Sequence, residues 1–158
     1  MRDATDVFSE WAGKGKDEGM ERGHAASVNE MLNLALATNN LSLRPFTAID
    51  IGCGNGWVVR KLQCLENCLS AEGVDGSTSM IEKAIQIDPK GKYSVAMLPQ
   101  WRPNNPVDLI HSMEFLYYLL DPVSMIKIIH DEWLNSGGVF VAGVDHYSEN
   151  KDSLEWPT

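Results

Sequence analysis

The chain has 158 residues, of which 44% are hydrophobic, and its formal net charge at pH 7 is −9. This length and composition suit one folded domain with a buried core and argue against intrinsic disorder. A nucleic-acid-binding protein needs a basic face to neutralise phosphates, and no cluster of Lys and Arg provides one, so DNA and RNA are not expected as partners.

The sequence carries no sign of secretion or membrane insertion. No apolar run approaches the length of a membrane helix, and the first ten residues, MRDATDVFSE, are polar and acidic. The three cysteines of such a chain are most simply reduced thiols, which indicates a cytoplasmic protein. On a helix, Cys64 and Cys68 would share a face, but two thiols do not complete a zinc site, so no metal is expected.

Residues 1–45 are predicted to form a helical segment. Residues 3–11 are a short candidate helix, and a loop rich in Gly and Lys follows at 13–19. Between residues 24 and 38 apolar side chains recur at helical spacing. Asn39 and Asn40 are expected to end this second helix.

After Pro45 the pattern changes to strands that alternate with helices. Ser79 and Glu82 have capping-box spacing, and Asp121 before Pro122 has the form of an N-cap followed by proline. Helices are expected at 58–65, 80–87 and 122–134, the last ended by Gly137 and Gly138. The expected strands are 47–51, 71–75, 93–97, 107–112 and 139–144. This alternation predicts an α/β fold with a doubly wound, mostly parallel sheet and helices on both faces.

The strongest motif is the segment 48–56, AIDIGCGNG, at the end of the first expected strand. Gly52 and Gly54 permit backbone torsions and close ligand approach that a Cβ would block. A dinucleotide fingerprint needs a third glycine where Trp57 stands, which also argues against an NAD-dependent oxidoreductase. No Gly-Lys-Ser/Thr follows, so a Walker loop is excluded as well. What remains is Asp50 followed by x-G-x-G-x-G.

This loop resembles the glycine-rich first motif of class I S-adenosylmethionine-dependent methyltransferases of the small-molecule type. The resemblance runs from residue 47 to 144, and it includes Asp75, where the family carries an acidic residue for the ribose hydroxyls. It implies a Rossmann-like fold, S-adenosyl-L-methionine as cofactor and methyl transfer to a small-molecule acceptor. The cofactor-binding residues that it implies are Asp50, Gly52, Cys53, Gly54, Asp75, Gly76, Met80, Met97 and His111.

The chain departs from the family at two places. No carboxylate follows the third strand, at 94–99, where many relatives bind the adenine amino group. Only residues 145–158 follow the fifth strand, too few for the helix and hairpin that usually complete the sheet. We therefore expect a fragment; if the chain is complete, the bare edge of the fifth strand favours self-association. The predicted single domain comprises the helical segment 1–45, a cofactor-binding core at 46–147 and a polar tail at 148–158.

No catalytic residue follows from the resemblance. His24, His111 and Glu114 are candidate bases or acceptor-binding groups, each with a purely structural alternative. Phe8 and Trp11 suit either a lid over the cofactor or an aromatic contact that fixes the N-terminal helix. The Asp/Asn-Pro-Pro-Tyr/Phe signature of many amino-group methyltransferases is missing at 111–114. The alternative function is a non-catalytic S-adenosylmethionine-binding or regulatory module of the same fold.

Overall fold

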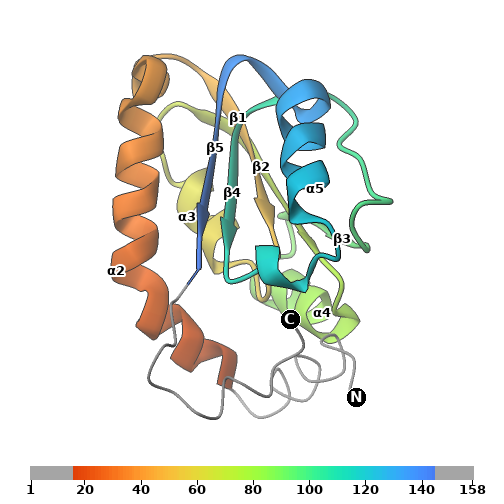
Figure 1. The fold of residues 1–158 in the computed structure, drawn as a ribbon. Helices are drawn as coiled ribbons and strands as arrows, with labels where there is room; N and C mark the ends of the chain where they lie inside the picture. Colours follow the sequence, from red (N-terminus) through yellow and green to blue (C-terminus); the bar gives the residue numbers. More distant parts are fainter. Residues whose placement is uncertain (1–15, 145–158) are drawn as a thin grey trace, which may run out of the picture.

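A five-stranded parallel sheet forms the centre of the computed structural model, which describes residues 16–144 (Figure 1). The strand order is β3-β2-β1-β4-β5, and every neighbouring pair is parallel. The strands are β1 (Phe46–Ile51), β2 (Cys68–Asp75), β3 (Lys92–Val95), β4 (Val107–Met113) and β5 (Leu134–Gly143). The order reverses between β1 and β4, so the predicted doubly wound α/β fold is confirmed.

Helices cover both faces of this sheet. The α-helices are α2 (Lys16–Ala37), α3 (Trp57–Gln63), α4 (Thr78–Ile87) and α5 (Pro122–Ile128). Short helical turns are η1 (Thr38–Leu43), η2 (Leu116–Tyr118) and η3 (Ile129–Trp133), the last a single π-helical turn that continues α5. Figure 1 shows α2 and α5 on opposite sides of the strands. The expected helix at 3–11 lies outside the described residues.

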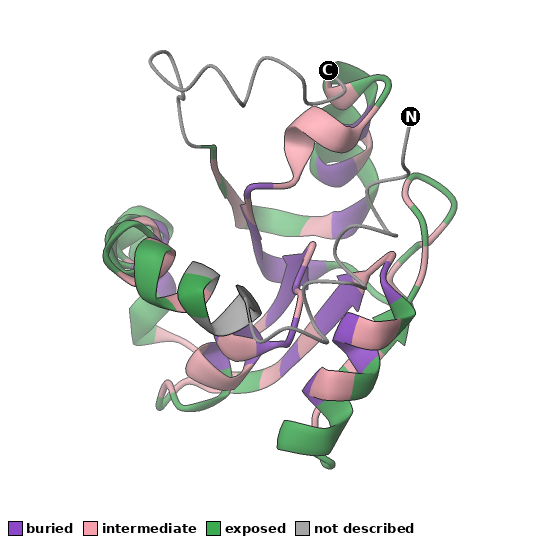
Figure 2. Cartoon of the chain, turned by 90° about the horizontal axis from the view of Figure 1, so that it is seen from below, coloured by how far each residue is buried: buried purple, intermediate pink, exposed green. Residues whose placement is uncertain are grey.

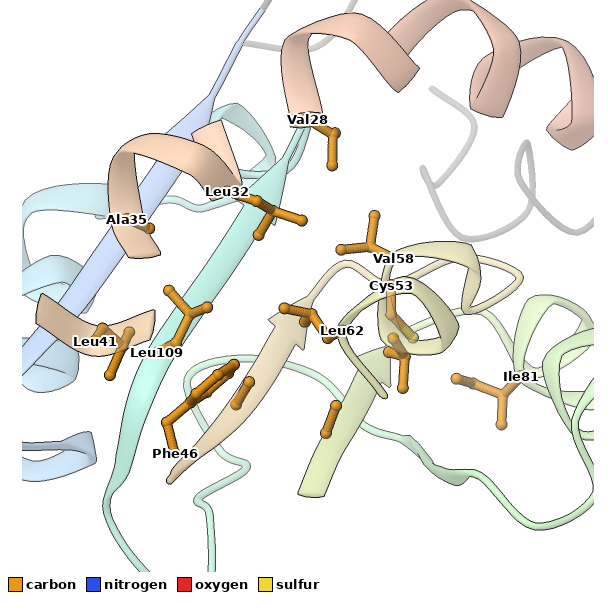
Figure 3. Close-up of a cluster of buried hydrophobic side chains, with 13 residues drawn as sticks. Val28, Leu32, Ala35, Leu41, Phe46, Cys53, Val58, Leu62, Ile81 and Leu109 are labelled. Atoms are coloured by element: carbon orange, nitrogen blue, oxygen red, sulfur yellow. The ribbon is translucent and has the colours of Figure 1, made fainter. Parts of the chain in front are cut away.

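The two faces of the sheet have separate hydrophobic layers. Phe46 and Ala48 of β1 belong to a cluster with α2 and α3 that includes Leu32 and Leu62 (Figure 3). Successive side chains of β1 point to opposite faces of the sheet, so Ile49 lies in the other layer, where α5 and η3 pack. Figure 2 shows the buried residues gathered on the strands and the exposed ones on the outer sides of the helices. A strand buried on both faces is typical of a parallel sheet.

Several predicted boundaries of the elements are wrong. The helix expected at 24–38 begins at Lys16, so part of the expected loop at 13–19 is helical. β2 begins at Cys68 rather than Ala71, and β3 ends at Val95 rather than Met97. α3 ends at Gln63, whereas β4 extends to Met113. The predicted end of the N-terminal helix is confirmed, because Asn39 and Asn40 have left-handed φ values of 51° and 53°.

The last helix ends within one residue of the predicted end at 134, but Gly137 and Gly138 do not end it. Its helical turns stop at Trp133, and both glycines lie inside β5. The pairing with β4 jumps from Val107 opposite Leu134 to Leu109 opposite Val139, so the intervening residues of β5 form an irregularity. Gly137 adopts a φ of 76° there. Gly137 therefore lies in a bulge-like irregularity of β5 and does not end a helix.

Ser77 caps α4, whereas the sequence pattern pointed to a capping box at Ser79 and Glu82. The Oγ atom of Ser77 accepts a hydrogen bond from the Met80 amide at 3.4 Å, in a buried position. Ser77→Ala should lower the free energy of unfolding by about 1 kcal/mol, because the amide loses its acceptor. Urea denaturation would measure the loss. Ser79→Ala is the matched control and should change the value by less than about 0.5 kcal/mol; equal losses would restore the capping-box interpretation.

Candidate functional site

The loop between β1 and α3 has three glycines with positive φ. The values are 71° at Gly52, 51° at Gly54 and 77° at Gly56. A Cβ on Gly56 would come within 2.5 Å of the Tyr93 ring, whereas a Cβ on Gly54 would meet no atom within 4 Å. The Gly52 amide donates to the Val74 carbonyl at 2.8 Å, which ties the loop to β2. The three glycines thus shape a fixed turn, and Gly54 in this turn faces open space.

Asp75, at the carboxyl end of β2, joins this loop to the next one. Its Oδ2 accepts a hydrogen bond from the Gly54 amide at 2.9 Å, and its Oδ1 accepts one from the Ser77 amide at 2.8 Å. Burial raises the pKa of the Asp75 carboxyl above its ordinary value, although both amide hydrogen bonds act to lower it. A carboxylate has about four acceptor positions. Asp75 can therefore accept two further hydrogen bonds, such as those of a vicinal diol.

Asp50 and His111 form a buried pair on the neighbouring strands β1 and β4. They are partners in the strand register, and His111 Nδ1 lies 2.7 Å from Asp50 Oδ1. Their side chains are 3% and 0% exposed, respectively. His111 Nε2 is buried and has no hydrogen-bond partner in the described part of the chain. The pair holds the ends of the two strands together, and its side chains are buried rather than at an open surface.

The other residues implied by the resemblance differ in accessibility. The Cys53 side chain is buried against Gly73, where a Cβ would come within 2.7 Å of Sγ. Burial raises the pKa of this thiol well above its ordinary value, so it is not a reactive group. Met80 is buried, Gly76 is partly exposed, and Met97 is 56% exposed just after β3. Of the two methionines, Met97 presents the accessible side chain.

Phe115, which the sequence pattern did not single out, lies against the glycine loop. A Cβ on Gly52 would come within 2.9 Å of the Phe115 side chain. The preceding residue, Glu114, has a φ of 55° and is nearly buried. Its Oε2 accepts a hydrogen bond from the Tyr117 hydroxyl at 3.0 Å. The segment after β4 therefore meets the loop after β1 at the point where the strand order reverses, which is where ligands bind in such sheets.

Some predicted features have no place in this cluster. His24 is half-buried on α2, and Phe8 and Trp11 lie outside the described residues. Within residues 16–144, no group of three or more His, Cys, Asp or Glu side chains is arranged to hold a metal ion. Over the same range, no helix is long and apolar enough to span a bilayer.

A family model described as a methyltransferase domain matches residues 3–157 of the chain. The chain belongs to this methyltransferase family. Among curated relatives, the trans-aconitate 2-methyltransferase of Klebsiella pneumoniae is 28% identical over 106 residues, which cover 67% of this chain and 42% of that protein. The corresponding enzyme of Azoarcus sp. is 32% identical over 59% of this chain and 36% of its own length. The chain thus spans less than half the length of these methyltransferases.

Two solved methyltransferase structures resemble this one over most of its length. A putative methyltransferase from Haloferax volcanii, in complex with the activator Trm112, has a TM-score of 0.77 and 30% identity, over 99% of this chain and 66% of that one. The complex of DhpI with S-adenosylhomocysteine has a TM-score of 0.69 and 19% identity, over 91% of this chain and 69% of that one. The second likeness confirms the Rossmann-like methyltransferase fold.

Proposed function

We propose that the protein binds S-adenosyl-L-methionine and transfers its methyl group to a small-molecule acceptor. The observation that carries this proposal is the connection of the glycine loop to Asp75 through the Gly54 amide. This connection places an open backbone turn and a carboxylate with spare acceptor capacity side by side at the carboxyl edge of the sheet. A ligand with an amino-acid group at one end and a ribose at the other fits that combination.

Each residue implied by the sequence has a proposed part in this site. The backbone from Gly52 through Cys53 to Gly54 would contact the amino-acid group, and Asp75 would accept hydrogen bonds from the ribose hydroxyls. Gly76, Met80 and Met97 would lie on the adenine side. Asp50 and His111 would hold β1 and β4 together next to the loop and so fix its position. The cofactor supplies a methyl group already activated by its sulfonium, so the protein's main task is to position the nucleophile.

The names of the curated relatives, trans-aconitate 2-methyltransferases, support a small-molecule acceptor. The S-adenosylhomocysteine in one similar solved structure supports the cofactor. We further propose a cytoplasmic location, supported by the free thiols of Cys53, Cys64 and Cys68. The core at 46–147 stays our proposal for the cofactor-binding part. Self-association through β5 stays a prediction; β5 is an edge strand of the described sheet.

A non-catalytic S-adenosylmethionine-binding module is the second candidate. It is favoured by one observation, the lack of a carboxylate in the segment 94–99 after β3. Such a module would bind the cofactor with the same loop and Asp75. It would differ by leaving the methyl group in place with every acceptor.

Isothermal titration tests the cofactor part of the proposal. We expect the full chain to bind both S-adenosylmethionine and S-adenosylhomocysteine, with one molecule per chain, because both present the same amino-acid and ribose groups. NADH is the control ligand and should not bind, since Trp57 occupies the position of the third dinucleotide glycine. If neither sulfur nucleotide binds, the proposed function is wrong. Release of S-adenosylhomocysteine with small acceptors then separates the enzyme from the non-catalytic module.

A further inference from the structure

Glu114 has an unusual backbone conformation for its residue type. Its φ of 55° lies in the left-handed region, which Gly, Asn and Asp adopt far more readily than Glu. Its amide still donates to the Gly143 carbonyl at 2.9 Å, so the strained residue is fixed at the end of the β4–β5 pairing. Conformations of this kind are disfavoured, and they concentrate at ligand-binding and catalytic sites.

The carboxylate of Glu114 is also held where solvation is poor. The residue is only 9% exposed, and the Tyr117 hydroxyl donates to Oε2 at 3.0 Å. The Tyr117 and Tyr118 rings pack with centroids 4.4 Å apart, which limits the movement of that hydroxyl. The burial of a carboxylate costs free energy unless hydrogen bonds compensate for the lost hydration. The Tyr117 hydroxyl provides such a hydrogen bond and fixes the position of the carboxylate.

Glu114 lies beside the proposed cofactor loop. The register pairs Ile51 at the end of β1 with Ser112 of β4, so the two residues that follow Ser112 continue alongside the glycine loop. Phe115 contacts Gly52 directly. Glu114 therefore belongs to the segment that borders the glycine loop, at the crossover between β1 and β4.

We propose that Glu114 faces the reacting centre and selects an acceptor that is a neutral amine or a hydroxyl group rather than a carboxylate. The inference rests on the proposed function, since it needs S-adenosylmethionine in the loop. It separates this chain from enzymes that methylate trans-aconitate, a tricarboxylate, because the Glu114 carboxylate repels an anion. A neutral nitrogen or oxygen acceptor gains positive charge as it takes the methyl group, and a nearby carboxylate stabilises that charge.

The proposed step balances with the groups named. A lone pair of the acceptor nitrogen or oxygen attacks the methyl carbon, and the new bond to carbon forms as the bond from carbon to sulfur breaks. The electron pair of the broken bond stays on sulfur, which gives neutral S-adenosylhomocysteine. The proton of the methylated nitrogen or oxygen then passes to the Glu114 carboxylate, which acts as general base.

The test uses two ligands that differ only at the reacting centre. S-adenosylhomocysteine has a neutral sulfur, whereas sinefungin has in its place a carbon atom that carries an ammonium group. We expect the wild-type protein to bind sinefungin about tenfold more tightly than S-adenosylhomocysteine, the effect of one charge-assisted hydrogen bond. Glu114→Gln should abolish this preference and change the Kd of S-adenosylhomocysteine by less than about twofold, because the loop contacts remain.

Two further variants distinguish the loss of the Glu114 carboxylate from a loss of folded structure. Glu114→Asn suits the left-handed backbone, so it should keep the unfolding midpoint of the wild type and still lose the preference for sinefungin. Glu66→Gln is the matched control, since Glu66 is an exposed carboxylate at the amino end of the sheet, and it should keep the preference.

Each result has a definite meaning. Absence of a preference for sinefungin in the wild type overturns the inference, as does an equal weakening of both ligands by Glu114→Gln. Retention of the preference in Glu114→Asn overturns it too. If neither ligand binds the wild type, the proposed function itself fails.

Discussion

Asp75→Ala should weaken the binding of S-adenosylhomocysteine by a factor of about 100 to 10,000. The estimate follows from the loss of two hydrogen bonds between ribose hydroxyls and a carboxylate, each worth about 1.5–3 kcal/mol. The substitution also removes the acceptor of the Gly54 and Ser77 amides, so the glycine loop loses an anchor. Both effects act on the same ligand, and isothermal titration measures their sum.

Glu72→Ala is the control on the same strand. Glu72 is a partly exposed carboxylate 3.7 Å from the Lys92 ammonium, and its removal should leave the Kd within about twofold. Asp75→Asn keeps the shape and one acceptor oxygen, so it should fall between the wild type and Asp75→Ala. Because burial raises the Asp75 pKa, we expect the affinity of the wild type to fall with decreasing pH earlier than an ordinary aspartate would cause. Unchanged affinity in Asp75→Ala would remove this residue from the site.

Asp108→Ala should lower the free energy of unfolding by about 3 kcal/mol, since it breaks a largely buried hydrogen-bond network. Asp108 Oδ1 accepts from Arg44 Nη1 at 2.9 Å and from Asn135 Nδ2 at 3.3 Å, and Oδ2 accepts from the Thr47 amide at 3.0 Å. This carboxylate therefore joins the segment before β1 to the starts of β4 and β5. Chemical denaturation at neutral pH measures the loss.

The pH dependence of stability gives a second measurement on Asp108. Burial acts to raise the pKa of this carboxyl, but the hydrogen bonds from Arg44, Thr47 and Asn135 outweigh it and the pKa is lowered. The folded-state pKa thus lies below the unfolded-state value. The stabilisation is present above the unfolded-state pKa, about 3.9, and is lost as the pH falls through the folded-state pKa. Asp108→Asn should therefore flatten the decline of stability in acid.

Glu132→Gln provides the comparison for these measurements. Glu132 forms an exposed ion pair with Arg102, with an N–O distance of 3.5 Å, and its replacement should change the stability by less than about 1 kcal/mol. A loss in Asp108→Ala no larger than this would show that the network contributes little.

Local patterns predicted most of the fold. The apolar run 47–51, the glycine loop and the Asp121-Pro122 start of α5 depend on neighbouring residues, and the Asp121 side chain does accept a hydrogen bond from the Ser124 amide. The start of α2 was missed because its first turns have no apolar stripe that repeats with helical spacing. Gly137 and Gly138 were misassigned because a glycine pair suits a helix end and a strand bulge equally well.

Contacts between distant segments limited the prediction of the site. Asp50 and Asp75 were recognised at the ends of their strands, but the pairing of Asp50 with His111 depends on the register of β1 against β4. The same applies to Phe115, whose contact with Gly52 links two loops that are far apart in the chain. Glu114 was recognised by its residue type alone. Its left-handed backbone has no signal in the sequence, because Glu carries no preference for it.

The Asp108 network and the glycine loop lie at opposite ends of the same strands. Asp108 and Thr47 are at the amino ends of β4 and β1, whereas Gly52 and Glu114 follow their carboxyl ends. A substitution after a carboxyl end thus leaves the groups that clamp the amino ends untouched. Residues in the loops at the carboxyl edge can therefore be exchanged without breaking the hydrogen bonds of Asp108 at the amino edge.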